Sequence, residues 1–274
     1  MKGQYIKVNG LETYYITQGK GYPLILIHGL PGSTYTWRNC ILPLAQHFQV
    51  YALDLKGFGY SDKPAGNYSL LAHTELIKDF MEGLNIPSAA LIGSSYGGGV
   101  GMTMALKYPE RANQLVLIGS IGYPFGRWIV DLSWLSQLQE LAFYALPFIP
   151  PLAKLLIRKA YEMAYYDPAL ISKEMIEEGY RLICLKGVAG SYFATVRGLD
   201  EQWLGENIKY LTKPTLIIAG ADDKMVPRWV AERLHSEIKG SRLEIIPQCG
   251  HIPQEEKPLI TNNLIIEFLQ RQTS

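Results

Sequence analysis

The chain contains few cysteines and no long apolar segment, and each shortage excludes a class of protein. Its three cysteines, Cys40, Cys184 and Cys249, are odd in number and widely spaced. This pattern argues against a disulfide scaffold and is typical of a reducing compartment. The most apolar stretch, residues 141–157, is interrupted by prolines and a lysine, whereas a membrane-spanning helix needs about 20 apolar residues. The N-terminus has no apolar signal core, so we expect a cytoplasmic protein without a membrane span.

A strong net charge is also missing. The 26 basic and 25 acidic residues give a net charge of +1, and the basic residues form no block. The charge distribution therefore provides no footprint for nucleic acid, and we expect a small-molecule partner. Asp54 and Asp62 have no cluster of histidines or carboxylates at ligand spacing around them, so we predict no metal site. We also expect no organic cofactor, and the oligomeric state stays open.

Apolar residues make up 48% of the chain, and their pattern predicts an α/β fold. Short strand-like runs alternate with helical stretches, which indicates crossover units and a mainly parallel sheet. We predict strands over residues 5–8, 13–17, 23–27, 49–53, 89–93, 114–118, 214–219 and 243–246. We predict helices over residues 33–44, 70–84, 96–107 and 228–238, and a final helix after the last strand that ends at about residue 270.

Between Gly122 and Gly205 the strand-like runs disappear, and helical and aromatic residues take over. The aromatic residues include Trp128, Trp134, Phe143, Tyr144, Phe148, Tyr161, Tyr165 and Tyr166. We predict a helical cap at residues 122–205, inserted after the sixth strand into a core formed by residues 1–121 and 206–274. This insertion lies near the carboxyl ends of the strands, where open α/β sheets bind ligands. An aromatic cap there favours an apolar pocket over the alternative of a packing subdomain without substrate contact.

The most informative stretch is residues 93–97, which read Gly-Ser-Ser-Tyr-Gly. A G-x-S-x-G turn between a strand and a helix forces its serine into a strained, exposed position. A strand-like run at 89–92 precedes the turn, and a helical run at 96–107 follows it. A serine hydroxyl attacks well only when it is presented in this way to a base. We therefore predict that Ser95 is a nucleophile, since the glycine spacing selects it over Ser94.

A base and an acid follow in the order that such a serine needs. His251 lies in the loop after the strand predicted at 243–246, and we predict that it is the general base. An aspartate beyond the strand at 214–219 can reach it, and both Asp222 and Asp223 lie there. Spacing alone does not choose between the two.

Four motifs together resemble the α/β-hydrolase family whose members carry a helical lid. The motifs lie at residues 28–33, 54–62, 93–99 and 223–227 with 250–251. The match covers nearly the whole chain, with the segment 122–205 less specific. The resemblance implies an α/β-hydrolase fold with a mostly parallel eight-stranded sheet, helices on both faces and an inserted cap. It also places the acid four residues before Pro227, which favours Asp223.

The resemblance further implies an oxyanion hole made of main-chain N–H groups. One donor is expected at Tyr96, directly after the nucleophile, and the other at Leu30, because Pro31 has no N–H. The residues expected to support the site are His28, Gly29, Gly93 and Gly97. We interpret Asp54 as a residue that holds its loop and Asp62 as a turn residue. The histidines interpreted as surface residues are His47, His73 and His235.

The type of hydrolase follows from the residues around the nucleophile. Haloalkane dehalogenases and epoxide hydrolases of this fold use an aspartate in place of Ser95. Carbon–carbon bond hydrolases of ring-cleavage pathways use serine but usually carry Asn before it and Trp after the histidine, where this chain has Ser94 and Ile252. Proline iminopeptidases have glycine in place of Leu30. We therefore predict a carboxylesterase that forms an acyl-enzyme on Ser95 and takes apolar or aromatic, small-to-medium esters.

Two alternatives to the esterase stay open. One is a carbon–carbon bond hydrolase of the meta-cleavage product type. The other belongs to a different class, a non-catalytic ligand-binding protein of the same fold, since some such proteins keep all three catalytic side chains. Covalent labelling of Ser95 by a fluorophosphonate distinguishes an enzyme from a binding protein.

Overall fold

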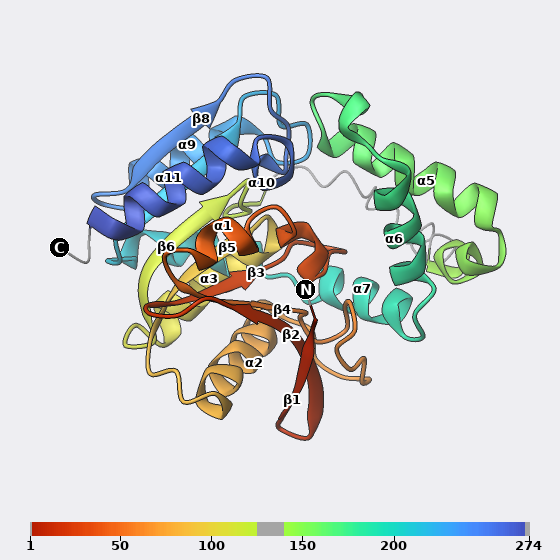
Figure 1. Ribbon diagram of the computed structural model, residues 1–274, viewed down its shortest axis with the longest axis horizontal. Helices are drawn as coiled ribbons and strands as arrows, with labels where there is room; N and C mark the ends of the chain where they lie inside the picture. Colours follow the sequence, from red (N-terminus) through yellow and green to blue (C-terminus); the bar gives the residue numbers. More distant parts are fainter. Residues whose placement is uncertain (1, 125–139, 272–274) are drawn as a thin grey trace.

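The computed structural model describes residues 2–124 and 140–271, and its centre is one eight-stranded sheet (Figure 1). The strand order is β1-β2-β4-β3-β5-β6-β7-β8. The pairs β1–β2 and β2–β4 are antiparallel, and all other neighbours are parallel. The predicted fold class is therefore confirmed. The strands are β1 (Gln4–Val8), β2 (Leu11–Gln18), β3 (Pro23–Ile27), β4 (Gln49–Leu53), β5 (Ala89–Ser94), β6 (Ala112–Ile118), β7 (Thr215–Gly220) and β8 (Arg242–Ile246).

Helices cover both faces of the sheet, because successive side chains of each strand point to opposite sides. In β5, Leu91 packs into one core with α2, α3 and α9, while Ile92 packs into a second core with α1 and α11. Both side chains are fully buried, so this central strand is apolar on its two faces. The helices are α1 (Ile41–Ala45), α2 (Leu70–Gly83), α3 (Tyr96–Lys107), α5 (Pro150–Ala164), α6 (Lys173–Ile183), α7 (Val188–Arg197), α8 (Glu201–Asn207), α9 (Arg228–Glu237), α10 (Pro253–Glu256) and α11 (Pro258–Arg271).

The single helix predicted over residues 33–44 is wrong in one respect, because the structure divides this segment in two. Ser33 caps it as expected: its hydroxyl accepts a hydrogen bond from the N–H of Tyr35 at 3.2 Å. The turn that follows is a 3-10 helix, η1 (Thr34–Trp37), and α1 begins only at Ile41. Pro43 explains the division, because proline has no N–H to donate and fits an α-helix only in its first turn.

Helix α3 lies against β3 and β5 with almost no space between the backbones. A Cβ atom on Gly97 would lie 2.2 Å from the carbonyl oxygen of Ile27, and one on Gly93 would lie 2.3 Å from the carbonyl oxygen of Gly97. No side chain fits at these distances. Glycine at both positions therefore allows α3 to begin directly after β5, which makes the sharp turn that holds Ser95.

We expect Gly97→Ala to lower the free energy of unfolding by about 3 kcal/mol or more, because the new methyl group overlaps a rigid backbone carbonyl. Gly101→Ala is the matched control in the same helix. Its Cβ would meet nothing closer than 3.9 Å, so we expect unchanged stability or a gain of up to about 1 kcal/mol. Urea unfolding of the two variants measures the difference. Equal stabilities would contradict the close approach.

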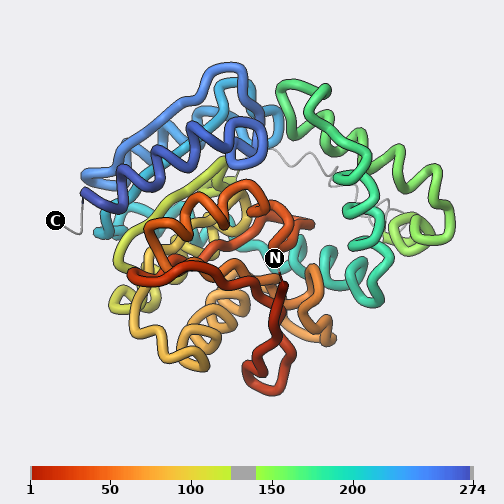
Figure 2. Tube along the Cα trace, in the orientation of Figure 1, coloured from red at the N-terminus to blue at the C-terminus, as the bar shows by residue number. Residues whose placement is uncertain are grey.

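Between β6 and β7 the described residues form helices and no strand. Helices α5 and α6 pack against each other. They lie at one end of the long axis of the molecule, and the end of α11 lies at the other (Figures 1 and 2). Trp128 and Trp134, which the sequence places in the cap, lie outside the described residues. Within the described ranges, every helix is too short or too polar to cross a membrane.

Candidate active site

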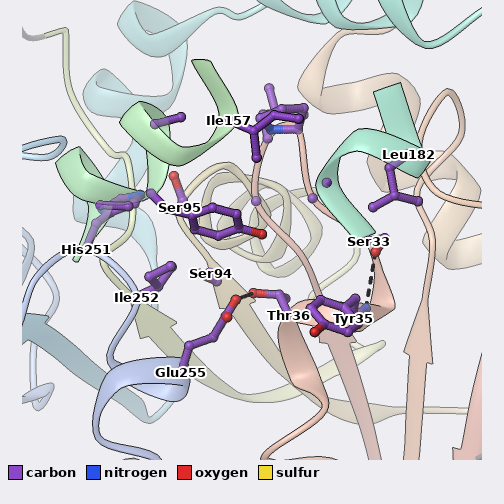
Figure 3. A pocket seen from close by; sticks show the side chains of 18 of the residues that line it. Ser33, Tyr35, Thr36, Ser94, Ser95, Ile157, Leu182, His251, Ile252 and Glu255 are labelled. Atoms are coloured by element: carbon purple, nitrogen blue, oxygen red, sulfur yellow. Dashed lines mark hydrogen bonds between the residues drawn. The ribbon is translucent and has the colours of Figure 1, made fainter. Parts of the chain in front are cut away.

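A cavity of about 210 Å³ opens where the carboxyl ends of the parallel strands meet α5 and α6 (Figure 3). Ser95 and His251 line it from the sheet side, while Ile157 and Leu182 line it from the two helices. The described residues that line it are mostly apolar, with a few polar groups between them. This is the composition of a small-molecule site. The cavity brings together residues from segments far apart in the sequence.

Ser95 occupies the turn between β5 and α3 in an unusual backbone conformation. Its φ is +54° and its ψ is −118°, although it carries a side chain. Such a conformation is strained for residues other than glycine and persists where the surroundings hold it. Here the N–H of Ser95 donates to the carbonyl of Ile118 at 2.8 Å, and its own carbonyl accepts from Gly98 at 3.0 Å. The turn therefore presents Ser95 to the cavity as the sequence predicts.

His251 and Asp223 form a buried pair beside the cavity. The Nδ1–H group of His251 donates to Oδ2 of Asp223 at 2.8 Å, and the two side chains are 6% and 2% exposed. The other oxygen of Asp223 accepts from the N–H groups of Met225 at 2.7 Å and Val226 at 2.9 Å. These bonds fix the carboxylate and direct Nε2 of the imidazole away from it. Asp222 is exposed, so Asp223 is the aspartate that orients His251.

The two expected oxyanion donors belong to two segments that lie close to Ser95. Tyr96 is the first residue of α3, where helical N–H groups have no partner within the helix. Leu30 lies in the loop after β3 and lines the cavity. This loop approaches Ser95 closely, since a Cβ atom on Gly29 would lie 2.9 Å from the Cβ of Ser95. The oxyanion hole made of these two main-chain donors stays a prediction.

His28 holds the loop after β3 and does not line the cavity. Its Nδ1–H donates to the carbonyl of Gly29 at 2.7 Å, and its Nε2 accepts from the N–H of Leu55 at 3.0 Å. The ring is completely buried, and burial lowers its pKa to about 4. His28 therefore stays neutral near pH 7 and links the loops that follow β3 and β4, in agreement with its expected supporting role.

Asp54 holds its loop, as expected. Its carboxylate accepts from the N–H groups of Thr34 at 2.6 Å and Tyr60 at 2.7 Å. Burial raises its pKa to about 6, and the two backbone N–H groups oppose that rise. Asp62 lies in the same loop, and its carboxylate accepts a hydrogen bond from the N–H of Glu12 at 2.9 Å. Among the described residues no group of histidines, cysteines and carboxylates is arranged to hold a metal ion.

The interpretation of His73 as a surface residue is wrong. The ring is fully buried beside the nucleophile turn, whereas His47 and His235 are exposed as expected. Nε2–H donates to the carbonyl of Lys56 at 3.0 Å, and Nδ1 accepts from the hydroxyl of Tyr96 at 2.7 Å. Burial lowers the pKa of His73 to about 3. His73 lies at helical spacing from the buried residues Leu70 and Ile77 on α2, so the apolar pattern of this helix already indicated that it faces the sheet.

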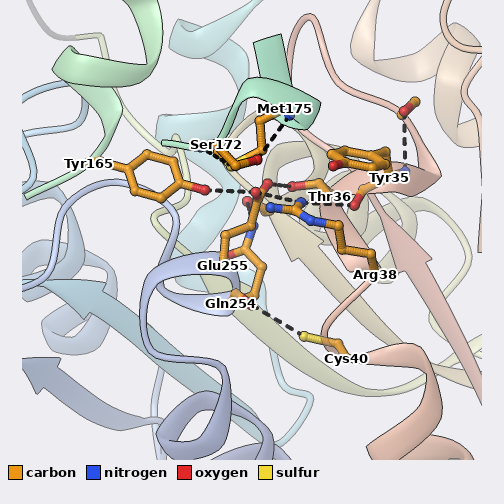
Figure 4. A network of polar contacts seen from close by, with 11 residues as sticks. Tyr35, Thr36, Arg38, Cys40, Tyr165, Ser172, Met175, Gln254 and Glu255 are labelled. Atoms are coloured by element: carbon orange, nitrogen blue, oxygen red, sulfur yellow. Dashed lines mark hydrogen bonds and ion pairs between the residues drawn. The ribbon is translucent and has the colours of Figure 1, made fainter. Parts of the chain in front are cut away.

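The sequence patterns did not predict a polar network that borders the cavity. Glu255 is its centre and accepts hydrogen bonds from Thr36 at 2.6 Å and Tyr165 at 2.8 Å (Figure 4). Arg38 forms an ion pair with the same carboxylate at 2.6 Å. Thr36 lies in η1, Arg38 directly follows η1, and Tyr165 directly follows α5. The network therefore ties the helices over the cavity to the loop after β3.

The neighbouring Glu256 joins the histidine loop to the segment after α5. One of its oxygens accepts from the N–H of Gly250 at 2.6 Å, and the other accepts from the N–H of Tyr166 at 2.7 Å. The N–H of His251 itself donates to the carbonyl of Ala164 at 2.6 Å. The main chain around the imidazole is thus bonded directly to the end of α5.

The aromatic residues of the cap contribute less to the cavity than expected. Of the eight named from the sequence, Tyr161 is the one that lines the cavity in the described part of the chain. Phe148 is 84% exposed, and Phe143 stacks on Tyr192 instead. Aliphatic side chains such as Ile157 and Leu182 form most of the cap side of the wall.

The family model described as the alpha/beta hydrolase fold matches residues 22–258. The chain is 28% identical, over 97% of its length, to the 2-hydroxy-6-oxo-2,4-heptadienoate hydrolase of Pseudomonas putida, 96% of which is covered. It is 31% identical to the 2-hydroxy-6-oxo-6-(2'-aminophenyl)hexa-2,4-dienoic acid hydrolase of Metapseudomonas resinovorans, over 98% of this chain and 91% of that one. A solved structure, the meta-cleavage product hydrolase of Pseudomonas fluorescens IP01, superposes with a TM-score of 0.84 at 30% identity, over 98% of both chains.

These relatives overturn the prediction of a carboxylesterase. That prediction depended on Ser94 and Ile252, which replace the Asn and Trp usual in carbon–carbon bond hydrolases. These two substitutions, each next to a predicted catalytic residue, are weaker evidence about the reaction than similarity along almost the whole chain. Ser94 also keeps a polar group next to the nucleophile, where its hydroxyl accepts from Nε2 of Gln254 at 2.9 Å. The sheet, the nucleophile turn and these matches agree, and the chain belongs to the α/β hydrolase fold family.

Proposed function

We propose that the chain is a carbon–carbon bond hydrolase of the meta-cleavage product type. The observation that carries this proposal is the match of 97–98% of the chain to four hydrolases of such compounds, at 28–31% identity. Their names describe conjugated oxo-dienoates or a muconate semialdehyde. A mostly apolar cavity next to Ser95 and His251 supports a substrate of this kind, because a conjugated chain is flat and largely apolar.

In the proposed reaction Ser95 adds through its hydroxyl oxygen to the carbonyl carbon beside the bond to be cleaved. His251 takes the hydroxyl proton through Nε2, because Asp223 holds Nδ1. The N–H groups of Leu30 and Tyr96 stabilise the oxyanion that forms. One such donor typically contributes about 3 kcal/mol to the stability of the transition state.

The adduct then breaks its carbon–carbon bond. Before this step the substrate shifts from its dienol to its keto form, in which the proton of the 2-hydroxyl has moved to the leaving carbon. The negative charge left by the cleavage then spreads through the enone as a dienolate, and the imidazolium of His251 donates its proton to that dienolate. Water attacks the acyl group on Ser95 with His251 again as base, which releases a carboxylic acid. One water is thus added across the bond, with the hydroxyl on the acyl fragment and the hydrogen on the other.

We also propose that residues 122–205 form a cap over a core of residues 1–121 and 206–274, and that the cap shields the reaction from bulk water. Ile157 and Tyr161 on α5 and Leu182 on α6 line the cavity opposite Ser95. A wall of this kind keeps bulk water from the leaving carbon until the proton has been delivered.

The direct test is incubation of the purified protein with 2-hydroxy-6-oxo-2,4-heptadienoate. Cleavage beside the 6-oxo group releases acetate and 2-hydroxypenta-2,4-dienoate. We expect the dienolate absorbance of the substrate to disappear with one acetate formed per substrate consumed. If no acetate were released from this acid, the proposed function would be contradicted.

A further inference from the structure

Two completely buried histidines, His28 on the loop after β3 and His73 on α2, lie close to the nucleophile turn. Neither is among the described residues that line the cavity. The ring of Phe58 lies next to both, with centroid distances of 6.0 Å to His28 and 6.3 Å to His73. Burial of an imidazole is costly unless its nitrogens are hydrogen-bonded, so the partners of each ring indicate what the ring holds in place.

The partners of His73 fix the tautomer of its ring. The carbonyl oxygen of Lys56 can only accept a hydrogen bond, so Nε2, which lies 3.0 Å from it, carries the proton. Nδ1 is then an acceptor, and the hydroxyl of Tyr96 donates to it at 2.7 Å. The carbonyl of Tyr68 lies 3.5 Å from the same hydroxyl and is the weaker acceptor. Because burial lowers the pKa of His73 to about 3, the ring keeps this neutral form near pH 7.

Tyr96 is the residue whose main-chain N–H is expected to be an oxyanion donor. Its side chain is buried, and its ring packs edge-on against the ring of His73 at a centroid distance of 5.5 Å. Residues 97–99 are all glycine, so the first turn of α3 has a side chain at Tyr96 alone. Glycine leaves the backbone conformationally free. The contacts of the Tyr96 side chain are therefore the means by which this turn is held sideways.

Both segments that carry the expected donors are bonded to the same short stretch after β4. His28 accepts through Nε2 from the N–H of Leu55 and donates to the carbonyl of Gly29, which precedes the second expected donor. His73 donates to the carbonyl of the next residue, Lys56. Two neutral imidazoles thus connect the two segments to adjacent residues, and the spacing of the donors depends on this common support.

We propose that His73 is a positioning residue for the oxyanion hole: by holding the hydroxyl of Tyr96, it sets the direction of the Tyr96 N–H relative to the donor in the loop after β3. This proposal rests on the proposed carbon–carbon bond hydrolysis and deepens it, since the oxyanion belongs to the adduct on Ser95. Such donors are effective when they already point to the place where charge develops. A rotated N–H would therefore slow the chemical step and leave the binding of the substrate almost unchanged.

Tyr96→Phe is the direct test, because it removes the hydroxyl and keeps the ring and the main-chain N–H. We expect kcat for acetate release to fall by about tenfold or more, with KM changed by less than about twofold. The rate constant for phosphonylation of Ser95 by a fluorophosphonate should fall by a similar factor, because the phosphonyl oxygen also gains charge as Ser95 attacks. The end point of the labelling counts the active sites, so a smaller amount of folded protein does not imitate the effect.

Tyr68→Phe is the matched control. The ring of Tyr68 also contacts His73, at a centroid distance of 5.8 Å, but its hydroxyl donates to the carbonyl of Pro64 and accepts from Ser191. We expect kcat to stay within about threefold of the wild type.

Substitutions of His73 itself separate positioning from stability. Asparagine has an amide oxygen that can replace Nδ1 as the acceptor for the hydroxyl of Tyr96, whereas leucine has no acceptor. Both substitutions should lower the free energy of unfolding, because they change a buried and fully bonded ring. We expect His73→Asn to keep most of the kcat that His73→Leu loses, with the rates again referred to labelled active sites.

The outcomes separate the positioning role from the reaction. If Tyr96→Phe and His73→Leu kept the kcat and the phosphonylation rate of the wild type, the role of His73 would be overturned and the proposed function would stand. If the wild type were labelled but released no acetate, the proposed function would be overturned, and the phosphonylation rates of the variants would still decide the role of His73. A wild-type protein that is neither labelled nor active would overturn both.

Discussion

Ser95→Ala is expected to lower kcat/KM by on the order of 10⁴- to 10⁶-fold while the fold and ligand binding persist. The substitution removes the protein atom that forms a covalent bond in the proposed reaction. It leaves the +54° backbone turn in place, because Ala and Ser have the same backbone requirements. Acetate release from the dienoate measures the loss, and a fluorophosphonate probe should label the wild type and not the variant.

Ser94→Ala is the matched control, because the two serines are adjacent and the sequence offered both as candidates. Ser94 is buried and its hydroxyl is engaged by Gln254, so its loss should cost less than about tenfold in kcat/KM. If Ser94→Ala removed activity and Ser95→Ala kept it, the assignment of the nucleophile would be wrong. Absence of labelling in the wild type at every pH between about 6 and 9 would favour a binding protein, because histidine must be neutral to act as a base.

Asp223→Asn should lower kcat by about 10⁴-fold. The asparagine keeps the shape of the side chain, but its amide can direct N–H toward Nδ1 of His251. The imidazole then holds its proton on Nε2, which is the atom that must accept the proton of Ser95. The bonds from Met225 and Val226 to the other oxygen should preserve the loop.

Asp222→Asn separates this effect from a general change of charge. Asp222 is the adjacent residue and is exposed, and its main-chain N–H donates to the carbonyl of Cys249 at 3.0 Å, a bond that does not depend on the side chain. We expect kcat to change by less than about threefold, since exposed charges far from the reacting atoms contribute little. Steady-state kinetics on both variants, with thermal unfolding as a check of the fold, provide the comparison. Similar losses in the two variants would contradict the assignment of Asp223.

Much of the site was predictable because its chemistry lies in short segments beside strands. Residues 89–97 encode a buried strand, a tight turn and a helix start, and local sterics alone fix Ser95 there. Asp223 and His251 follow the last two strands of the sheet, and the carboxyl ends of parallel strands meet at one edge. The order along the chain was therefore enough to predict that an aspartate after β7 meets His251, while the choice of Asp223 over Asp222 came from the family resemblance.

The cavity wall was not predictable in the same way. Helix α6 is strongly amphipathic, but a helical pattern does not state which element its inner face meets. Glu178 looks like one of several acidic residues until α6 is placed over the loop after β3. Glu255 has the same difficulty, because its partners lie at positions 36, 38 and 165. Such contacts depend on tertiary packing between distant segments.

The bonds around His251 determine how the cavity can open. The carbonyl of Ala164 accepts from the N–H of His251, and Glu256 spans from Gly250 to Tyr166. If the end of α5 moved, these bonds would therefore move the loop that carries His251 and change the position of the imidazole relative to Ser95. A movement of the cap that preserves these bonds would therefore have to pivot about residues 164–167.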